Sequence, residues 1–416
     1  MNNQKFSPQR GGAYKGRQPV IDAIRGFSLL GILLSNMPLF MYGLDATTTS
    51  EIYPFNQTMF NVLEVLIIGS FYPIFLFLFG YGTQQLVYKL TTAKDIPQSS
   101  LIQQGWIAND RPKATLRRRF LMLSLLGVLH FILVWDGDIL LSYGVLGFVL
   151  LLFINQKTKT LITWTIVLGV LMLSIYTEYT GSTPESLAES QNYYEQAQMS
   201  LGNGIYLEVI EFRLLGSLME GIPGYALLIL APVTFLIYLP LALLGMIAAR
   251  HGWFINPESK RGTYIKYAAI LGIIGFVLNL AGVLMKESGI SFGYSLIING
   301  GPLLAFGYIF LFAYLYTRTS ETGKMKQAFT AVGKLSLTNY LLHSMICTFI
   351  FYGYGIGLFG QLGLVAGTLL ALAIYMLTAA LSYLYLQRFH NGPVEWLLRK
   401  ITYRSPKSSS KRNVSG

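Results

Sequence analysis

The sequence predicts an all-α, polytopic integral membrane protein: a bundle of about 10 transmembrane helices with both termini in the cytoplasm. The 416 residues are 53% hydrophobic and only 12% charged, and the mean hydropathy is +0.50. Apolar stretches of about 20 residues, long enough to cross a hydrocarbon core of roughly 30 Å, recur along the chain. This composition excludes the soluble multi-domain class that the length alone would predict.

Ten apolar segments are the expected spans, and most are bounded by polar links. Residues 60–88 are too long for one straight crossing, so we expect Pro73 to kink this segment or to separate an interfacial turn at 60–69 from the span proper. The expected spans are 22–43, 60–88, 117–135, 138–155, 160–179, 224–249, 265–285, 291–317, 327–354 and 362–388.

Basic residues gather in alternate links, which sets the expected orientation because cytoplasmic loops are enriched in Lys and Arg. The N-terminal segment and 89–119 are basic, whereas 44–59 has no Lys or Arg and 180–203 carries only acidic charges. The net charge of +12 therefore reflects membrane orientation, and we expect no nucleic-acid partner.

These segments divide the chain into five regions. The amphipathic stretch 204–222 is expected to form an outer-surface helix or lid. The regions are 1–19, a basic cytoplasmic segment; 20–179, a first bundle of about five spans; 180–223, an outer loop with that amphipathic helix; 224–390, a second bundle of about five spans; and 391–416, a basic cytoplasmic tail.

Asp22, Arg25 and Asn36 form the first candidate site, because three polar side chains interrupt one apolar segment. A charge near the bilayer centre costs about 2.5–3.5 kcal/mol on insertion scales, which favours a functional role. Arg25 would lie at the cytoplasmic mouth and Asn36 roughly 16 Å above it, at 1.5 Å per residue. The alternative is an interfacial Asp22–Arg25 ion pair, with Asn36 bridging two helices.

His130, Asp138, Ser142 and Tyr143 form the second candidate site, where two spans meet at a short outer turn. Asp138 and Ser142 are four residues apart, with Tyr143 adjacent, so they can share a pocket with His130 in the outer leaflet. A His held by a carboxylate is suited to removing a proton from a hydroxyl or an amine. The alternative is a hairpin in which Asp138 caps the second helix.

Ser336, Asn339 and His343 form a polar stripe on an otherwise apolar segment. They are expected either to line the same cavity or to bond a neighbouring helix. The single cysteine, Cys347, offers neither a disulfide nor a metal cluster, and the chain has no zinc, phosphate-loop or dinucleotide motif. No metal site is expected.

Five motifs give the chain a resemblance to the YeiB-like bacterial membrane proteins, a domain of unknown function, over nearly its whole length. They are DAIRGFSLLGILLSN near the start, FLFLFGYG at 75–82, GVLHFILVWDGDILLSYGVLG at 127–147, GKLSLTNYLLHS at 333–344 and GPVEWLLRKITY at 392–403.

The opening D-x-x-R-G, followed by Asn eleven residues after the Arg, is also similar to the first core helix of transmembrane acyltransferases such as heparan-α-glucosaminide N-acetyltransferase. That resemblance implies acyl transfer from a cytosolic acyl-CoA, with Arg25 near the CoA and Asn36 near the reacting carbonyl. In that enzyme the catalytic His follows the Asn by eleven residues, where this chain has Thr47. Either the chain does not catalyse this reaction or His130 takes the role.

The leading hypothesis is therefore an acyltransferase-like protein of the bacterial cell membrane. In it His130 is the base, Asp138 orients it and Asn36 polarises a thioester carbonyl. Its expected co-substrate is acetyl-CoA or another acyl-CoA, with no tightly bound cofactor. Its partners are the lipid bilayer and an unidentified small molecule, and a homodimer is left open. The alternatives are a transporter or exporter of a small solute and a non-catalytic scaffold. A closed tunnel reaching His130 from the basic side would favour the acyltransferase over the transporter.

Overall fold

The computed structural model describes residues 18–43, 56–92, 111–175, 184–219, 222–320 and 323–403, most of them helical. The elements in chain order are α1 (Pro19–Tyr42), α2 (Asn56–Leu66), α3 (Phe71–Thr92), α5 (Arg111–Leu133), α6 (Leu140–Leu150), α7 (Thr158–Ile175), α8 (Pro184–Ala197), a π-helical turn η3 (Gln198–Gly202), α9 (Tyr206–Leu215), the two-stranded antiparallel hairpin β1 (Ser217–Met219) and β2 (Ile222–Pro223), the 3₁₀ turn η4 (Gly224–Ala226), α10 (Leu227–Phe235), the 3₁₀ turn η5 (Leu236–Tyr238), α11 (Leu239–Arg250), the 3₁₀ turn η6 (Pro257–Lys260), α12 (Arg261–Glu287), α13 (Phe292–Arg318), α14 (Lys324–Lys334), α15 (Ser336–Phe351), α16 (Leu364–Arg388) and α17 (Pro393–Thr402).

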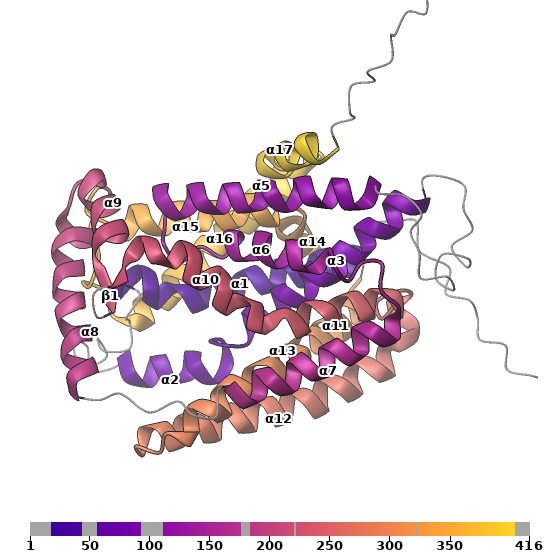
Figure 1. Cartoon of the computed structure of the whole chain (residues 1–416), viewed down its shortest axis with the longest axis horizontal. Coiled ribbons are helices and arrows are strands. Elements are labelled where there is room, and N and C mark those ends of the chain that lie inside the picture. The colour runs from indigo at the N-terminus through magenta and orange to yellow at the C-terminus, as the bar shows by residue number, and fades with distance from the viewer. Residues whose placement is uncertain are drawn as a thin grey trace, which may run out of the picture.

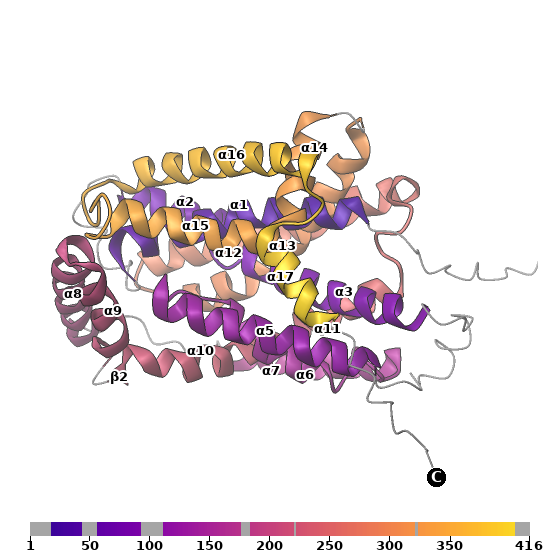
Figure 2. The same ribbon diagram turned by 90° about the horizontal axis from the view of Figure 1, so that it is seen from above.

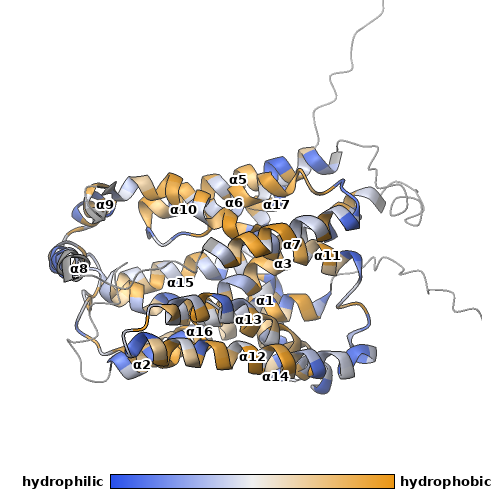
Figure 3. Cartoon of the chain, turned by 60° about the horizontal axis from the view of Figure 1, so that its bottom comes forward, coloured by the Kyte–Doolittle hydropathy of each residue, from blue (hydrophilic) through white to orange (hydrophobic). Residues whose placement is uncertain are grey.

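The long helices lie side by side along the longest axis of the molecule, and α8 and α9 lie across one end of them (Figures 1 and 2). Apolar residues dominate the middle of the bundle, and polar residues gather at its two ends (Figure 3). This distribution is the one expected of helices that cross a hydrocarbon layer. The predicted class, an all-α polytopic membrane bundle, is confirmed.

Six helical stretches in the described part of the chain are long and apolar enough to cross a membrane, and three shorter helices are apolar. The six are Pro19–Tyr42, Asn56–Thr91, Gly224–Arg250, Pro257–Glu287, Phe292–Arg318 and Leu364–Arg388; the three are Leu140–Leu150, Thr158–Ser174 and Ser336–Phe351. The count of ten spans and the cytoplasmic position of the termini stay predictions. The expected terminal segments lie largely outside the described residues, as does Thr47.

The two ends of the bundle differ in charge. Arg250 donates hydrogen bonds to Gln84 and to the carbonyl of Gln156. The end of the bundle that contains Arg250 is called the basic end. Pro19, Arg119, Lys326 and Arg399 line cavities at this end. The opposite end, which carries α8 and α9, is called the far end. There Tyr206 of α9 donates a hydrogen bond to the carbonyl of Leu133, the last residue of α5.

Two expected spans are each two helices. The segment 60–88 breaks at residues 67–70, between α2 and α3, where Gly69 adopts a φ of +81° that favours glycine. Of the two alternatives for this segment, the kink at Pro73 is wrong, because this residue lies in the first turn of α3, where proline is tolerated. The other alternative, a separate segment before the span proper, agrees with the break, although residues 56–66 form a helix rather than a turn. The segment 327–354 breaks at Leu335 into α14 and α15.

Two other segments also differ from expectation. The amphipathic stretch 204–222 is helical only to Leu215, after which the chain turns into the β1–β2 hairpin. The segment 224–249 contains η5 between α10 and α11, with Pro232 inside α10 and Pro240 in the first turn of α11. Hydropathy alone does not mark the break at η5, because α10 and α11 on either side of it are both apolar.

Helix α1 forms the centre of the bundle, and most of its side chains are buried. Pro19 begins it, where a missing backbone N–H costs nothing, and the N–H of Gly43 closes its end on the carbonyl of Leu39. A Cβ on Gly26 would overlap the backbone of Phe329, and one on Gly333 would overlap the carbonyl of Asp22. These two glycines therefore allow α1 and α14 to pack backbone to backbone.

Candidate functional site

A buried His–Asp pair lies at the far end of α5. His130 occupies the last turn of α5, and its Nδ1 lies 2.9 Å from Oδ1 of Asp138, in the turn that leads to α6. The two residues are only 3% and 8% exposed. A neutral imidazole that donates from Nδ1 to a carboxylate presents Nε2 as a proton acceptor. The pair therefore has the arrangement of an oriented base.

Asp138 also caps the next helix, since its Oδ2 accepts the backbone N–H of Leu141 at 2.9 Å. The capping role and the pairing role, which the sequence left as alternatives, use different oxygens of one carboxylate. Gly127, one turn before His130, makes this possible, because a Cβ there would overlap the N–H of Leu141 and crowd Asp138 Oδ2. The hairpin thus fixes the carboxylate against α5.

The second ring nitrogen of His130 is buried and, within the part of the chain that the structure describes, has no hydrogen-bond partner. Buried polar atoms are almost always satisfied, so each exception needs an explanation. An unoccupied acceptor on a base that is already oriented from its other side is the geometry needed to receive a substrate proton.

Tyr340 of α15 connects the pair to the interior of the bundle. Its hydroxyl accepts the N–H of Ile139 at 3.2 Å and lies 3.5 Å from Asp138 Oδ1 as a donor. Its ring centroid is 5.5 Å from that of His130. Tyr340 thus packs directly against both members of the pair.

A cavity of about 340 Å³ leads from the basic end to Tyr340. Its inner wall includes Ile139, Leu140, Tyr143 and Tyr340, next to the His–Asp pair, while His130 itself does not line it. Its mouth carries four cationic side chains and one acidic one: Arg25, Arg119, Lys334, Arg399 and Glu395. The cavity therefore joins a positively charged opening to the neighbourhood of a buried base.

Asn36 is placed deep in the bundle, where its Oδ1 accepts a hydrogen bond from Tyr72 of α3. Tyr143 is buried, and its hydroxyl has no hydrogen-bond partner among the described residues. Ser142 is also buried on α6, but no hydrogen bond joins it to His130 or Asp138 within the same described residues. Tyr143 lines the same cavity wall as Tyr340, whereas Ser142 is not among the residues that line this cavity.

Asp22 and Arg25 form the expected ion pair on α1, with Nη1 and Oδ1 3.2 Å apart. Arg25 also lines the mouth of the cavity. The two alternatives for this residue, an ion pair with Asp22 and a position at the mouth of a ligand site, are therefore compatible.

Asn339 and His343 face α16 rather than the cavity. Asn339 Nδ2 donates to Ser382 at 2.9 Å, and His343 Nε2 lies 2.9 Å from the hydroxyl of Thr378. Ser336, Leu337 and Tyr340, on another face of α15, line the cavity instead. Asn339 and His343 therefore have the interhelical arrangement that was one of the two alternatives for the polar stripe, whereas Ser336 lines the cavity.

A second carboxylate, Asp136, shares the turn with Asp138. Burial raises the pKa of Asp136, and the guanidinium of Arg213 acts in the opposite direction with a smaller effect. Arg213 is itself buried and donates to the carbonyl of Ile132 at 3.0 Å, which ties α9 to the end of α5.

The sequence reasoning missed Tyr340, Tyr72, Arg119, Lys334 and Glu395. Tyr340 stands beside Asn339 in the motif that was singled out, but a tyrosine in a membrane helix carries no distinguishing signal. Arg119 was interpreted only as a topology marker, and Lys334 appeared only within the motif at 333–344. Glu395 is the one acidic residue in the predicted basic tail, and this exception could have indicated that it has a specific contact.

Fold and site together define a multi-pass helical membrane protein that encloses buried polar groups beside an internal cavity. Residues 248–405 match the family described as "Protein of unknown function (DUF418)". The chain is 30% identical over 403 residues to "Uncharacterized protein YxaH" of Bacillus subtilis (strain 168), covering 93% of this chain and 94% of the relative. It is 28% identical over 410 residues to "Uncharacterized protein YeiB" of Escherichia coli (strain K12), covering 94% and 97%.

A third relative, the "Uncharacterized 39.9 kDa protein in amylase 3'region" of Bacillus acidopullulyticus, is 24% identical over 405 residues, with 92% and 93% of the two chains covered. The chain therefore belongs to the DUF418, YeiB-like family, and the predicted family resemblance is confirmed. The likeness to transmembrane acyltransferases stays a prediction.

Proposed function

We propose that the protein is an acyl-CoA-dependent acyltransferase of the bacterial cytoplasmic membrane. It would take an acyl group from cytosolic acyl-CoA at the basic end and pass it to a hydroxyl or amine acceptor from the far side. The observation that carries this proposal is the cavity that begins among basic side chains and ends at Tyr340, against the His130–Asp138 pair.

The charge of the cavity mouth supports a phosphorylated donor. Arg119, Lys334 and Arg399 come from three different helices and, with Arg25, surround one opening. Arginine and lysine are the side chains that bind phosphate groups, by charge-assisted hydrogen bonds. Beyond the mouth the wall is largely apolar and aromatic, with Phe75, Phe79, Leu123 and Leu140, which suits a narrow thioester arm.

The proposed chemistry needs one base and no redox step. His130 Nε2 accepts the proton of the acceptor hydroxyl or amine while that group attacks the thioester carbonyl carbon. The C–S bond breaks, the acyl group remains on the acceptor, and the CoA sulfur leaves with the proton returned by His130. Asp138 stabilises the imidazolium between these two transfers.

In this proposal Tyr340 controls access to His130, and Asn36 acts directly on the thioester carbonyl. The Tyr340 ring lies between the cavity and His130, so it must change rotamer for a thioester to reach Nε2. Asn36 uses Oδ1 to accept from Tyr72, which leaves its amide N–H group to polarise the thioester carbonyl.

The proposal is tested by following radiolabelled acetyl-CoA with purified protein in lipid nanodiscs. We expect saturable binding that Arg25→Ala weakens, and CoA release that falls by about 10²-fold or more in His130→Gln. His343→Gln is the matched control, since His343 is a buried histidine that contacts Thr378 and not the cavity. Folded wild-type protein that binds no acetyl-CoA would reject the proposal and favour the transporter.

A further inference from the structure

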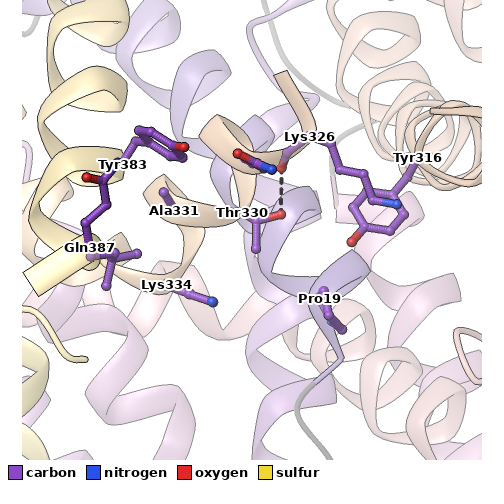
Figure 4. A pocket seen from close by; sticks show the side chains of 10 residues that line it. Pro19, Tyr316, Lys326, Thr330, Ala331, Lys334, Tyr383 and Gln387 are labelled. Carbon is purple, nitrogen blue, oxygen red and sulfur yellow. Dashed lines mark hydrogen bonds between the residues drawn. The ribbon is translucent and has the colours of Figure 1, made fainter. Parts of the chain in front are cut away.

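A second cavity, of about 270 Å³, opens at the basic end between the ends of α1, α13, α14 and α16. Figure 4 shows its lining, which includes Tyr316, Lys326, Thr330, Lys334, Tyr383 and Gln387. It is separate from the cavity that leads to Tyr340, although Lys334 borders both. The proposed acyl transfer makes no use of it.

Among the described residues that line this cavity are two lysines and no acidic residue. Lys326 is only 7% exposed, and its Nζ lies 4.0 Å from the centroid of the Tyr316 ring. A cation over an aromatic face is attracted by the quadrupole of the ring. Lys334 adds a second charge, while Tyr383 and Gln387 supply neutral hydrogen-bond donors. These groups together fit a phosphate.

The wall formed by α16 continues into an exposed apolar surface. Met376, Leu377, Leu381 and Leu384 are exposed, by 64%, 56%, 50% and 57%. Leu384 lies three residues before Gln387, so the apolar surface adjoins the polar lining on one face of the helix. A ligand with a phosphate in the cavity and hydrocarbon chains along α16 would match both parts.

We infer that this cavity binds the headgroup phosphate of an anionic phospholipid, with the acyl chains of the lipid lying against α16. Basic pockets between transmembrane helices on the cytoplasmic side are recognised sites for such headgroups. The inference goes beyond the proposed acyl transfer and does not depend on it, because Lys326 and Gln387 border only this second cavity.

The test is native mass spectrometry of the detergent-solubilised full chain, titrated with phosphatidylglycerol or phosphatidylcholine. We expect a saturable phosphatidylglycerol adduct that Lys326→Gln and Lys334→Gln each weaken about fivefold, from the loss of one lysine near the headgroup. Gln387→Glu should weaken it similarly by adding a carboxylate, and Gln387 is exposed, so this variant leaves the core packing unchanged. Lys324→Gln is the matched control, because Lys324 is an exposed lysine on α14 that does not line the cavity.

Two results would overturn the inference. One is equal weakening by Lys324→Gln, or no weakening by Gln387→Glu, which would make the adduct a general effect of surface charge. The other is binding of glycerol phosphate as tight as that of phosphatidylglycerol, which would identify a soluble phosphate ligand. Arg119→Gln, which alters only the other cavity, should leave the lipid adduct unchanged whether or not acetyl-CoA binds.

Discussion

The carboxylate of Asp138 has two separate contacts, and this sets what a substitution there will do. Oδ1 faces His130, and Oδ2 accepts the N–H of Leu141 at the start of α6. Removal of the negative charge therefore affects the histidine, whereas removal of the acceptor atom affects the helix. Replacement of Asp138 by Asn separates the effect on His130 from the effect on α6, because the amide keeps an acceptor oxygen but carries no charge.

We expect Asp138→Asn to lower acyl transfer by about 10²-fold or more while the protein stays folded. The amide oxygen can still accept the Leu141 N–H, but it no longer stabilises an imidazolium on His130. The measurements are CoA release and the thermal unfolding midpoint. Asp136→Asn, in the same turn, is the control and should retain transfer. Equal loss in both variants would show that the turn matters only for folding.

At this scale the sequence predicted the His130–Asp138 contact, because only a tight turn separates the two residues. It could not place Asn36 against Tyr72, or Tyr340 against Asp138, because these pairs are 36 and 202 residues apart in the chain. The spacing of Asn339 and His343 predicted that both side chains lie on one face of their helix. Only the packing of α16 showed what that face contacts.

The elements around the site depend on close helix packing. Gly333 ends α14 against α1, at the carbonyl of Asp22, and it also lines the cavity. Any side chain there must push the two helices apart, since the atoms it meets are backbone.

Gly333→Ala is therefore expected to destabilise the protein by about 1–3 kcal/mol, the usual range for overpacking. Gly169→Ala is the matched control: this glycine lies within α7 with no atom near its Cβ position, and alanine there should stabilise by about 0.5–1 kcal/mol. Chemical unfolding in detergent measures both. A Gly333→Ala protein as stable as wild type would contradict the packing described for α1 and α14.

Helix α17 covers the mouth of the first cavity and is anchored by one carboxylate. Glu395 accepts the N–H groups of Leu337 and Thr338 at 2.8 and 3.0 Å, and the Thr338 hydroxyl at 2.5 Å. These N–H groups belong to the first turn of α15, where a negative charge is favoured.

We expect Glu395→Gln to loosen α17, at a cost of about 1.5–3 kcal/mol for hydrogen bonds to a charged group. Hydrogen exchange should then rise in α17 and in the first turn of α15, and acetyl-CoA affinity should change because Glu395 lines the mouth. Glu258→Gln, an exposed carboxylate at the basic end, should change neither. Unaltered exchange in Glu395→Gln would mean that α17 is held by other contacts.

The sequence predicted most helices, but it did not place their interruptions correctly. The break at residues 67–70 lies inside an apolar run, so hydropathy does not mark it. The break at Leu335 follows Lys334 and was missed because α14 and α15 were taken as one span. Helix α17 was included in a polar tail because ten residues with three charges resemble a link until α5 and α15 are packed against them.

For the whole molecule, the distribution of Lys and Arg predicts that the basic end faces the cytoplasm. This is tested with single cysteines in a Cys347→Ser background. Ser259→Cys at the basic end should be protected from a membrane-impermeant maleimide in intact cells, and Gln191→Cys on α8 should be labelled. Both side chains are exposed in the structure, so access depends on sidedness alone. The reverse pattern would invert the orientation and remove the cytosolic acyl donor from the proposal.

Composition and charge were enough to predict the class of protein, because these properties are summed over many residues, and five motifs spread along the chain were enough to predict the family. The cavity could not be predicted in this way. Its wall is assembled from helices throughout the chain, from Arg25 on α1 to Arg399 on α17, and no sequence window contains it.

The most direct test of the central claim is whether CoA occupies the cavity with its sulfur near Tyr340. Leu140→Cys places a thiol on the inner wall, and a CoA disulfide should transfer CoA to it, which intact-mass spectrometry detects. The natural Cys347 is buried and outside the lining, so the wild-type chain should stay unmodified, as should Leu146→Cys, which is buried on α6 away from the cavity. CoA addition to Leu140→Cys alone, competed by acetyl-CoA, is the result we predict. No addition to Leu140→Cys, or equal addition to Leu146→Cys, would contradict a CoA site in this cavity.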